Sequence, residues 1–371
     1  LKEPAAAEPH LLAGCGEVAD HADQIPAYDY PHRHDAFDQL IHILEASNRP
    51  AEAEKWAAEW YKLSNKLVQK TLVDGKFTTA TVPLVSQVVL AHLTAERHDD
   101  ALAMYREVNA KYGPADKPAA DAWLRLSGTV FNDYEGRLHH DRIKPWAELR
   151  IPSLERDLDT LRKMKQAEVP LLRATNSLAF SYLHAGRKAD VVKLVEEVIA
   201  RQKEYGWRTD ADMVNSYGST AKAVALAGRP DLAVEVSSAV LAGVKKSSPS
   251  AEVLATARFS LGLARSYTGE HADTEECFRE AVGLQLEVDA KHWKAAKYKA
   301  WLGFALHDLK RYSEAEPILK EAYTEWEDQV ASAPAWEKQH PLLIASRLAS
   351  LYEAIHQSDE AAKWKAICEQ K

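Results

Sequence analysis

The chain has 371 residues, 46% of them hydrophobic, which is enough for two ordinary domains or one long array of repeats. Its formal net charge of −8 disfavours a general nucleic-acid binder, because neutralising phosphates needs clustered lysine and arginine. No run of about 18 apolar residues occurs, so the sequence contains no membrane-spanning segment. Its three scattered cysteines are too few for a disulfide framework.

The N-terminal part of the chain is rich in proline. Residues 1–34 include Pro4, Pro9, Pro26 and Pro31, and we expect a short helix within a partly irregular cap. No stretch of the chain alternates Val, Ile or Thr between hairpin turns. The sequence therefore predicts an all-α protein.

Residues 35–169 show helix-turn-helix units whose apolar spacing is degenerate. One unit covers residues 35–60 and a second covers 84–108. The positions that fit the spacing are Leu40, Leu44, Ala53, Ala57, Val88, Val89, Ala101, Tyr105 and Val108. A loop insertion is predicted near 135–151, because Gly136, Pro145 and Pro152 interrupt the helical pattern.

Five clearer units follow in residues 170–371. A shift of 41 residues lays Leu302 and Gly303 on Leu261 and Gly262. Corresponding positions in the other three units are Thr220, Leu178 and Leu348. The small residues let two helix backbones approach, while the leucines fill the seam between them. A regular period of this length is typical of an α-solenoid.

These residues resemble the tetratricopeptide repeat (TPR), whose pattern is a large residue, Leu-Gly or Leu-Ala, Tyr, and then Ala, Phe and Ala on the second helix. The period here is about 41–48 residues, longer than the family's usual repeat, and resembles the kinesin-light-chain style. The resemblance implies a right-handed superhelix of helix pairs. It also implies a protein-interaction scaffold that binds a peptide or protein partner in a concave groove.

In that architecture the first helix of each pair lines the groove. The residues predicted to line it are Arg173, Asn176, Phe180, Asn215, Lys222, Phe259, Leu263, Lys297, Phe304 and His307. This aromatic and basic lining suits an extended peptide with an apolar anchor and an acidic group. The lysine and asparagine set with which some relatives clamp carboxylates is not reproduced.

No catalytic or cofactor motif is present, so we expect neither an enzyme nor a bound cofactor. His32, His34, His139 and His140 are ligand types for zinc, but they lack metal-site spacing, and solvated histidines are favoured over a metal centre. Two alternatives stay open. One is a small-molecule or metal sensor site in the groove or in the 135–151 loop; the other is a structural subunit of a larger assembly.

The last seventy or so residues also resemble the repeat region of planctomycete-type bacterial Ser/Thr protein kinases. The sequence motifs that show this resemblance are Glu314–Pro317, Leu351–Ala354 and Glu360–Trp364. It implies the regulatory or docking region of a larger bacterial signalling protein, since no kinase signature lies in the chain itself. We expect a cytoplasmic location, or an extracytoplasmic one if a spanning segment precedes Leu1. The partner, the peptide motif and the oligomeric state are left open.

Overall fold

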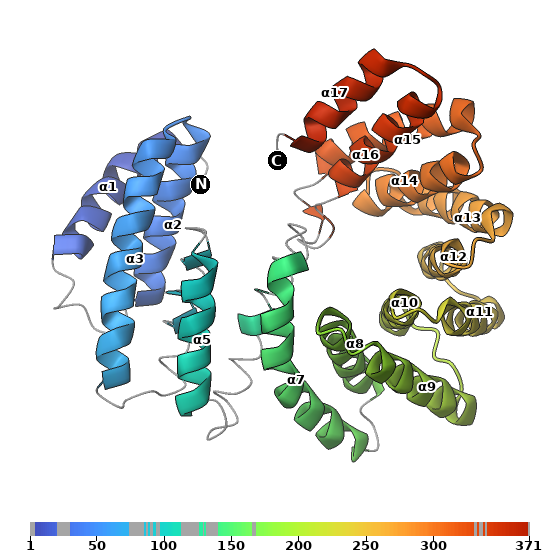
Figure 1. The fold of residues 1–371 in the computed structure, drawn as a ribbon, viewed down its shortest axis with the longest axis horizontal. Coiled ribbons are helices and arrows are strands. Elements are labelled where there is room, and N and C mark those ends of the chain that lie inside the picture. The colour runs from blue at the N-terminus through green and yellow to red at the C-terminus, as the bar shows by residue number, and fades with distance from the viewer. Residues whose placement is uncertain are drawn as a thin grey trace. The chain divides into compact units, whose positions relative to one another are not determined.

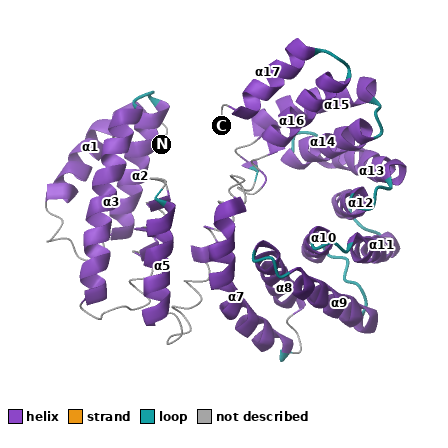
Figure 2. Ribbon diagram, viewed as in Figure 1, coloured by secondary structure: helices purple, strands orange, loops and turns teal. Residues whose placement is uncertain are grey.

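A computed structural model describes most of the chain. The described residues are 4–20, 30–73, 85–86, 88–89, 92–93, 97–112, 126–128, 130, 140–164, 168–329, 332–333, 337 and 340–369. Within these ranges the regular structure is helical and no strand occurs, which confirms the all-α prediction (Figure 2).

The chain divides into two compact units, Leu1–Phe131 and Asn132–Lys371. The helices of the first unit are α1 (Pro4–Asp20), α2 (Tyr30–Ala46), α3 (Pro50–Val73) and α5 (His98–Tyr112). The second unit begins with α7 (His140–Arg162). Five helix pairs follow, namely α8 (Glu168–His184) with α9 (Lys188–Tyr205), α10 (Ala211–Leu226) with α11 (Pro230–Lys246), α12 (Ala251–Ser266) with α13 (His271–Asp289), α14 (Trp293–Asp308) with α15 (Tyr312–Gln329), and α16 (His340–Ala354) with α17 (Ser358–Glu369).

The turns inside the helix pairs share one backbone device. A residue with positive φ follows the first helix in each of six pairs, at Asn48, Gly186, Gly228, Gly269, Lys310 and His356. In five of these turns the N–H of the next residue donates back to a carbonyl of the first helix; for example, Arg187 N donates to Tyr182 O at 2.8 Å and Arg311 N donates to Leu306 O at 2.9 Å. This left-handed residue ends the helix and reverses the chain.

An ion pair marks the start of many second helices. Arg49 Nε donates to Glu52 at 2.7 Å, and Arg187 Nε donates to Asp190 at the same distance. Arg97 repeats the arrangement with Asp100 in the first unit, as Arg311 does with Glu314 in the second. This Arg-x-x-Asp/Glu spacing is a repeat signal in the sequence that the apolar alignment leaves unused, and it extends the helix-pair pattern into the first unit.

Small residues bring the paired helices together as the sequence predicts. A Cβ placed on Gly303 would lie 2.5 Å from Leu319 Cδ2, and one on Gly262 would lie 2.8 Å from Phe278 Cε1. Leu319 and Phe278 are almost fully buried, so neither can move aside. Only glycine therefore allows α14 to meet α15, and α12 to meet α13, at this separation.

The expected loop near 135–151 is wrong for residues 140–151, which lie in α7; residues 135–139 lie outside the described part. The buried side chains of α7 recur at helical spacing, at Ile143, Trp146, Ala147, Ile151, Leu154 and Leu158. This packing outweighs the prolines. Pro145 lies near the start of the helix, and Pro152 points to solvent, where water can bond the carbonyl it leaves unpaired.

The N-terminal segment is more regular than a cap of one short helix would be. Helix α1 covers Pro4–Asp20 with Pro9 inside it, and α2 already begins at Tyr30. Residues 1–3 and 21–29 lie outside the described part of the chain. In the core of this unit, the ring of Phe37 on α2 packs 4.8 Å from that of Trp60 on α3.

Candidate functional site

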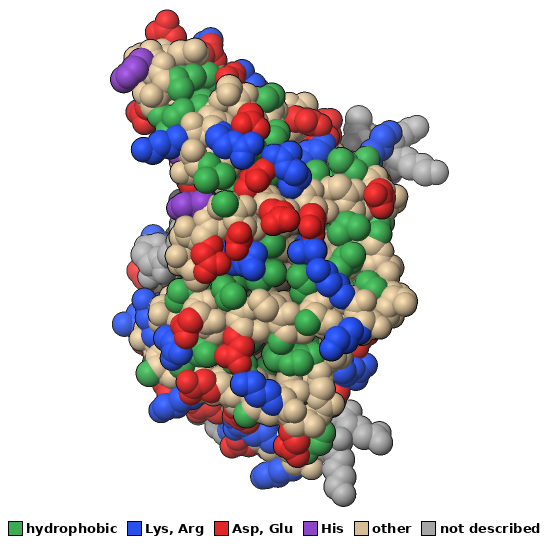
Figure 3. Space-filling model, turned by 90° about the vertical axis from the view of Figure 1, so that its right-hand side faces the viewer, with side chains coloured by type: hydrophobic (Ala, Val, Ile, Leu, Met, Phe, Trp, Pro, Cys, Tyr) green, Lys and Arg blue, Asp and Glu red, His purple; other side chains and the backbone are tan. Residues whose placement is uncertain are grey.

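Within the second unit the helix pairs follow a curve with two rows. The first helices of the pairs, α8, α10, α12, α14 and α16, form the inner row, and the second helices form the outer row (Figure 1). Figure 3 views the side of the outer row, where acidic and basic side chains alternate and apolar side chains are scattered among them. The residues predicted to line the groove all lie on inner-row helices.

At the α8–α10 end, two of the predicted residues, Arg173 and Asn176, bond to the neighbouring helix. Asn176 Nδ2 donates to Ser216 O at 2.8 Å, and Asn176 Oδ1 accepts from Thr220 Oγ1 at 2.7 Å. Arg173 pairs with Asp212 at 3.1 Å, also across the two helices. Asn176 therefore joins adjacent repeats, and its hydrogen-bonding capacity is largely used within the array.

Phe180, Asn215 and Lys222 remain partly accessible at this end. Asn215 is exposed and donates only within its own helix, to Ala211 O at 2.9 Å. Lys222 Nζ lies 5.8 Å from the centroid of the Phe180 ring, so a cation and an aromatic side chain from adjacent repeats meet on the inner row.

Phe259 and Leu263 on α12 serve mainly as packing residues. The Phe259 side chain is 7% exposed, and its ring stacks on Tyr298 of the next repeat at 4.5 Å. Trp301 lies 6.2 Å from the same ring in an edge-on arrangement, as expected for a tryptophan that packs between repeats. Leu263 is partly buried against the same apolar cluster.

Lys297 on α14 is held by a carboxylate from outside the inner row. Its Nζ donates to Glu337 Oε1 at 2.6 Å, and it also lies 5.1 Å from the centroid of the Phe259 ring. Burial lowers the pKa of Lys297 against the opposing attraction of Glu337. Burial works against ionisation of Glu337 too, but Lys297 and His340 outweigh it, so the pKa of this carboxyl is below its usual value.

Phe304 lies in the wall of an open pocket between α14 and α16. The pocket has a volume of about 380 Å³ and is lined by Trp301, Phe304, Leu343, Ser346, Arg347 and Ser350. Arg347 spans its rim, with the guanidinium 5.2 Å from the Phe304 ring and Nη1 donating to Asp308 at 2.6 Å. The indole Nε1 of Trp301 is buried, with no hydrogen-bond acceptor among the described residues. This arrangement can enclose an apolar side chain beside a positive charge.

His307 lies at the edge of the same region. Its Nδ1 is 3.4 Å from both Asp308 Oδ1 and Arg347 Nη1, while its Nε2 is buried and has no partner in the part of the chain that the structure describes. Burial lowers the pKa of His307, with Asp308 acting in the opposite direction, so the ring is neutral at physiological pH.

Four wall residues of the pocket were missed from the sequence: Leu343, Ser346, Arg347 and Ser350. Their spacing of three, four and seven positions places them on one face of α16. Because Ile344, Leu348 and Leu351 form the buried face, the helical period predicts a second face on which Arg347 lies. The repeat alignment in the sequence used only small and large apolar positions such as Leu348, which lie on the buried face of α16.

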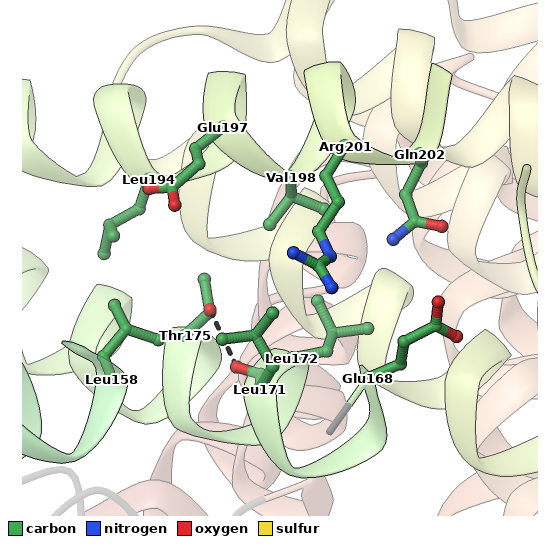
Figure 4. A pocket seen from close by; sticks show the side chains of 10 residues that line it. All are labelled: Leu158, Glu168, Leu171, Leu172, Thr175, Leu194, Glu197, Val198, Arg201 and Gln202. Carbon is green, nitrogen blue, oxygen red and sulfur yellow. Dashed lines mark hydrogen bonds between the residues drawn. The ribbon is translucent and has the colours of Figure 1, made fainter. Parts of the chain in front are cut away.

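A second cavity lies between α7, α8 and α9 and is far smaller. Figure 4 shows its lining, with Arg201, Gln202 and Glu168 at one end and Leu158 and Leu194 at the other. Its volume of about 20 Å³ has room for a single water molecule. Arg201 Nε has no hydrogen-bond partner within the described part. This cavity suits internal hydration and not a ligand.

Within the described residues, no three His, Cys, Asp or Glu side chains gather into a metal-binding group. The predicted alternative on His139 and His140 lies outside the described side chains, as do the side chains of His32 and His34. No helix in the described part of the chain has the length and apolar character needed to cross a membrane.

Comparison with solved structures places the fold. The chain is similar to BtubC (BKLC) from P. vanneervenii, with a TM-score of 0.50, 17% identity, and coverage of 60% of this chain and 90% of the other. TPR-like repeats described as a kinesin light chain, from Podosopora anserina, match with a TM-score of 0.44, 21% identity, and coverage of 56% and 96%. A Rap protein in complex with Competence and Sporulation Factor matches with a TM-score of 0.44, 12% identity, and coverage of 91% and 96%.

No protein-family model matches the chain, and no curated protein is similar enough to match. The fold is a TPR-like α-solenoid, as the sequence predicted. At these identities the similarity concerns the fold alone. It does not identify a partner for this chain, and it does not support the resemblance to kinase-linked repeats.

Proposed function

We propose that this protein is an interaction scaffold that binds a segment of a partner protein on the inner row of the second unit. The observation that carries the proposal is the open pocket between α14 and α16, where Trp301, Phe304 and Leu343 surround a volume of about 380 Å³. Leu343 is 37% exposed and lies in the same pocket wall as the two aromatic side chains. A partner side chain in the pocket would bury it.

The chemistry of the rim indicates what kind of segment fits. Arg347 places a guanidinium beside the apolar wall, and Lys297 lies one helical turn from Trp301 on α14. Cations at both ends of an apolar pocket favour a peptide in which acidic groups flank an apolar anchor. This chemistry supports a peptide with an apolar anchor and an acidic group, although Phe259 and Leu263 serve mainly in packing.

The test uses three pools of amidated, fluorescein-labelled octapeptides. Each pool has a central Phe or Leu, and its other positions are drawn from Gly, Ser and one of Glu, Gln or Lys. Binding to the full chain is followed by fluorescence anisotropy. We expect the Glu pool to bind, and Leu343→Asp to weaken its binding at least about tenfold, because a carboxylate then faces both the apolar wall and the acidic peptide.

Leu286→Asp is the matched control. Leu286 is 40% exposed, close to the value for Leu343, but it lies on the outer-row helix α13. Binding of the Glu pool should be unchanged in this variant. Absence of binding by every pool to the wild-type protein, or equal losses in the two variants, would remove the inner-row proposal.

A structural subunit that docks through its outer row is the second candidate. The exposed apolar side chains Leu286 and Val288 on α13, and Tyr205 at the end of α9, favour it. In that case native complexes isolated from the source cell would dissociate in the Leu286→Asp variant and persist in the Leu343→Asp variant. The inner-row proposal predicts the reverse.

We also propose that the array acts within a bacterial signalling protein, as its docking or regulatory region. Support comes from the resemblance of residues 314–317, 351–354 and 360–364 to kinase-linked repeats. The intact mass of the native polypeptide, measured with an antibody against this chain, tests the idea. A product much larger than the present chain, with kinase activity that co-purifies, is expected; a product of the same mass would rule this role out.

A further inference from the structure

Glu337 forms an ion pair with Lys297 of the inner row. We infer that the Glu337 carboxylate occupies a carboxylate-binding position at Lys297, so that an acidic partner must displace this side chain to bind. The inference rests on the proposed function: the partner's carboxylate would bind Lys297, beside the apolar pocket, in competition with Glu337.

The contacts of Glu337 are those of a bound anion. Its Oε1 accepts from Lys297 Nζ at 2.6 Å, and its Oε2 lies 3.3 Å from His340 Nδ1. The two partners of the ion pair are only 17% and 12% exposed, so the pair is largely shielded from water. In such surroundings a charge-assisted hydrogen bond is strong, and either charge left alone is costly.

The site carries more positive charge than Glu337 neutralises. Lys222 on α10 is close enough to lower the pKa of Glu337 and that of Lys297. Burial lowers the pKa of His340 to about 4, so the ring is neutral at pH 7. Lys222 forms no ion pair with the described side chains, and its Nζ lies 5.8 Å from the centroid of the Phe180 ring. Lys222 therefore adds a second positive charge near the Glu337–Lys297 pair, a balance that favours anions.

The position is also correctly spaced from the apolar pocket. Lys297, Trp301 and Phe304 follow one another on α14 at intervals of four and three, so they share a face of the helix. Neighbours at this spacing lie about 5–6 Å apart. In an extended peptide, side chains two positions apart lie on one side, separated by about 6.6 Å. An apolar anchor in the pocket would thus bring an acidic residue two positions away to Lys297.

Glu337 is not part of a helix pair. It lies in the connection between Gln329, which ends α15, and His340, which begins α16. A carboxylate supplied by a connecting segment can leave Lys297 without separating the helices of a repeat. When a partner carboxylate replaces it, the charge around Lys297 and Lys222 is conserved, and the released Glu337 becomes hydrated.

The experiment compares wild-type protein with Glu337→Gln, using the Glu, Gln and Lys octapeptide pools. Gln keeps the size of the side chain and removes its charge. We expect the variant to bind the Glu pool at least about tenfold more tightly than wild type, and the Gln pool with unchanged affinity, because only the acidic pool competed with Glu337. Lys297→Met added to Glu337→Gln should abolish the gain.

Glu325→Gln is the control. Glu325 pairs with Lys299 on the opposite side of α14, and Lys299 keeps Glu321 as a second partner at 2.7 Å, so the affinity for every pool should stay at the wild-type value. If wild type binds the Glu pool and Glu337→Gln binds it no more tightly, Glu337 only fastens the connection, and the inference is wrong. If no pool binds the wild-type protein, the proposed function itself fails.

Folding of the variants is checked by circular dichroism and thermal unfolding. Should Glu337→Gln be unfolded, Glu337→Asp keeps the charge but shortens the reach to Lys297. It should then give a smaller gain in affinity for the Glu pool. An unchanged affinity in a folded Glu337→Asp protein would overturn the inference.

Discussion

The two ends of the inner row use the same repeat for different purposes. Between α8 and α10, Asn176 and Thr220 join adjacent repeats through hydrogen bonds. Between α12, α14 and α16, aromatic side chains join them, and an open pocket remains beside Phe304. At the first end a side chain bonds to the neighbouring backbone, whereas at the second end Trp301 and Phe304 line a pocket between α14 and α16. A common helical period therefore does not imply a uniform binding surface.

The largest expected effect is at the aromatic end. Phe259→Ala removes a 7% exposed ring that packs against Phe278, Tyr298 and Trp301, and should cost about 3–5 kcal/mol of stability. Because repeat arrays can unfold locally, amide hydrogen exchange of α12 to α15 is the appropriate measurement. Protection should fall there first and be retained in α8. A uniform loss would show that the ends are not separate.

The next effect depends on pH and involves His340, which stacks on Trp326 at 4.7 Å. Burial lowers the pKa of His340 from 6.5 to about 4 in the folded state. The positive charges of Lys297 and Lys222 lower it further, whereas the negative charge of Glu337 raises it. The unfolded chain thus binds more protons between these values, and stability falls as pH decreases from about 6.5 towards 4. The loss attributable to this group is about 3 kcal/mol.

Thermal unfolding of the wild-type protein between pH 4 and 8 checks this dependence. His340→Phe keeps a ring against Trp326 but cannot take up a proton, so its unfolding temperature should vary less over the acidic range. An equally steep profile in His340→Phe would assign the acid sensitivity to other groups.

The smallest effect is expected at the polar end. Asn176→Ala removes one of the donors to Ser216 O and one of the two acceptors of Thr220 Oγ1, which should cost about 1 kcal/mol. Asn215→Ala is the comparison, because exposed Asn215 bonds only within α10 and should change stability little. Urea unfolding of both variants gives the difference. Equal stabilities would mean that the bonds between repeats contribute nothing measurable.

The helical period itself was enough to identify the fold. Leu302, Gly303 and Leu319 have the sizes that one close contact between helices requires, so their spacing predicts the helix pairs that the structure contains. Local proline signals were weaker evidence. The segment around Pro145 and Pro152 forms α7 because its apolar residues pack against the next helix, a contact that local sequence rules do not take into account.

The sequence alone determined the fold class and the helix pairs whose first helices carry Phe304 and Lys297. Only the tertiary structure decided which of these side chains are open to a ligand. Phe259 is covered by Tyr298 of the next repeat, Asn176 is used by the neighbouring helix, and Lys297 is held by Glu337, forty positions away in the sequence. Helical periodicity fixes the direction of a side chain, but contacts between distant residues determine whether it stays accessible.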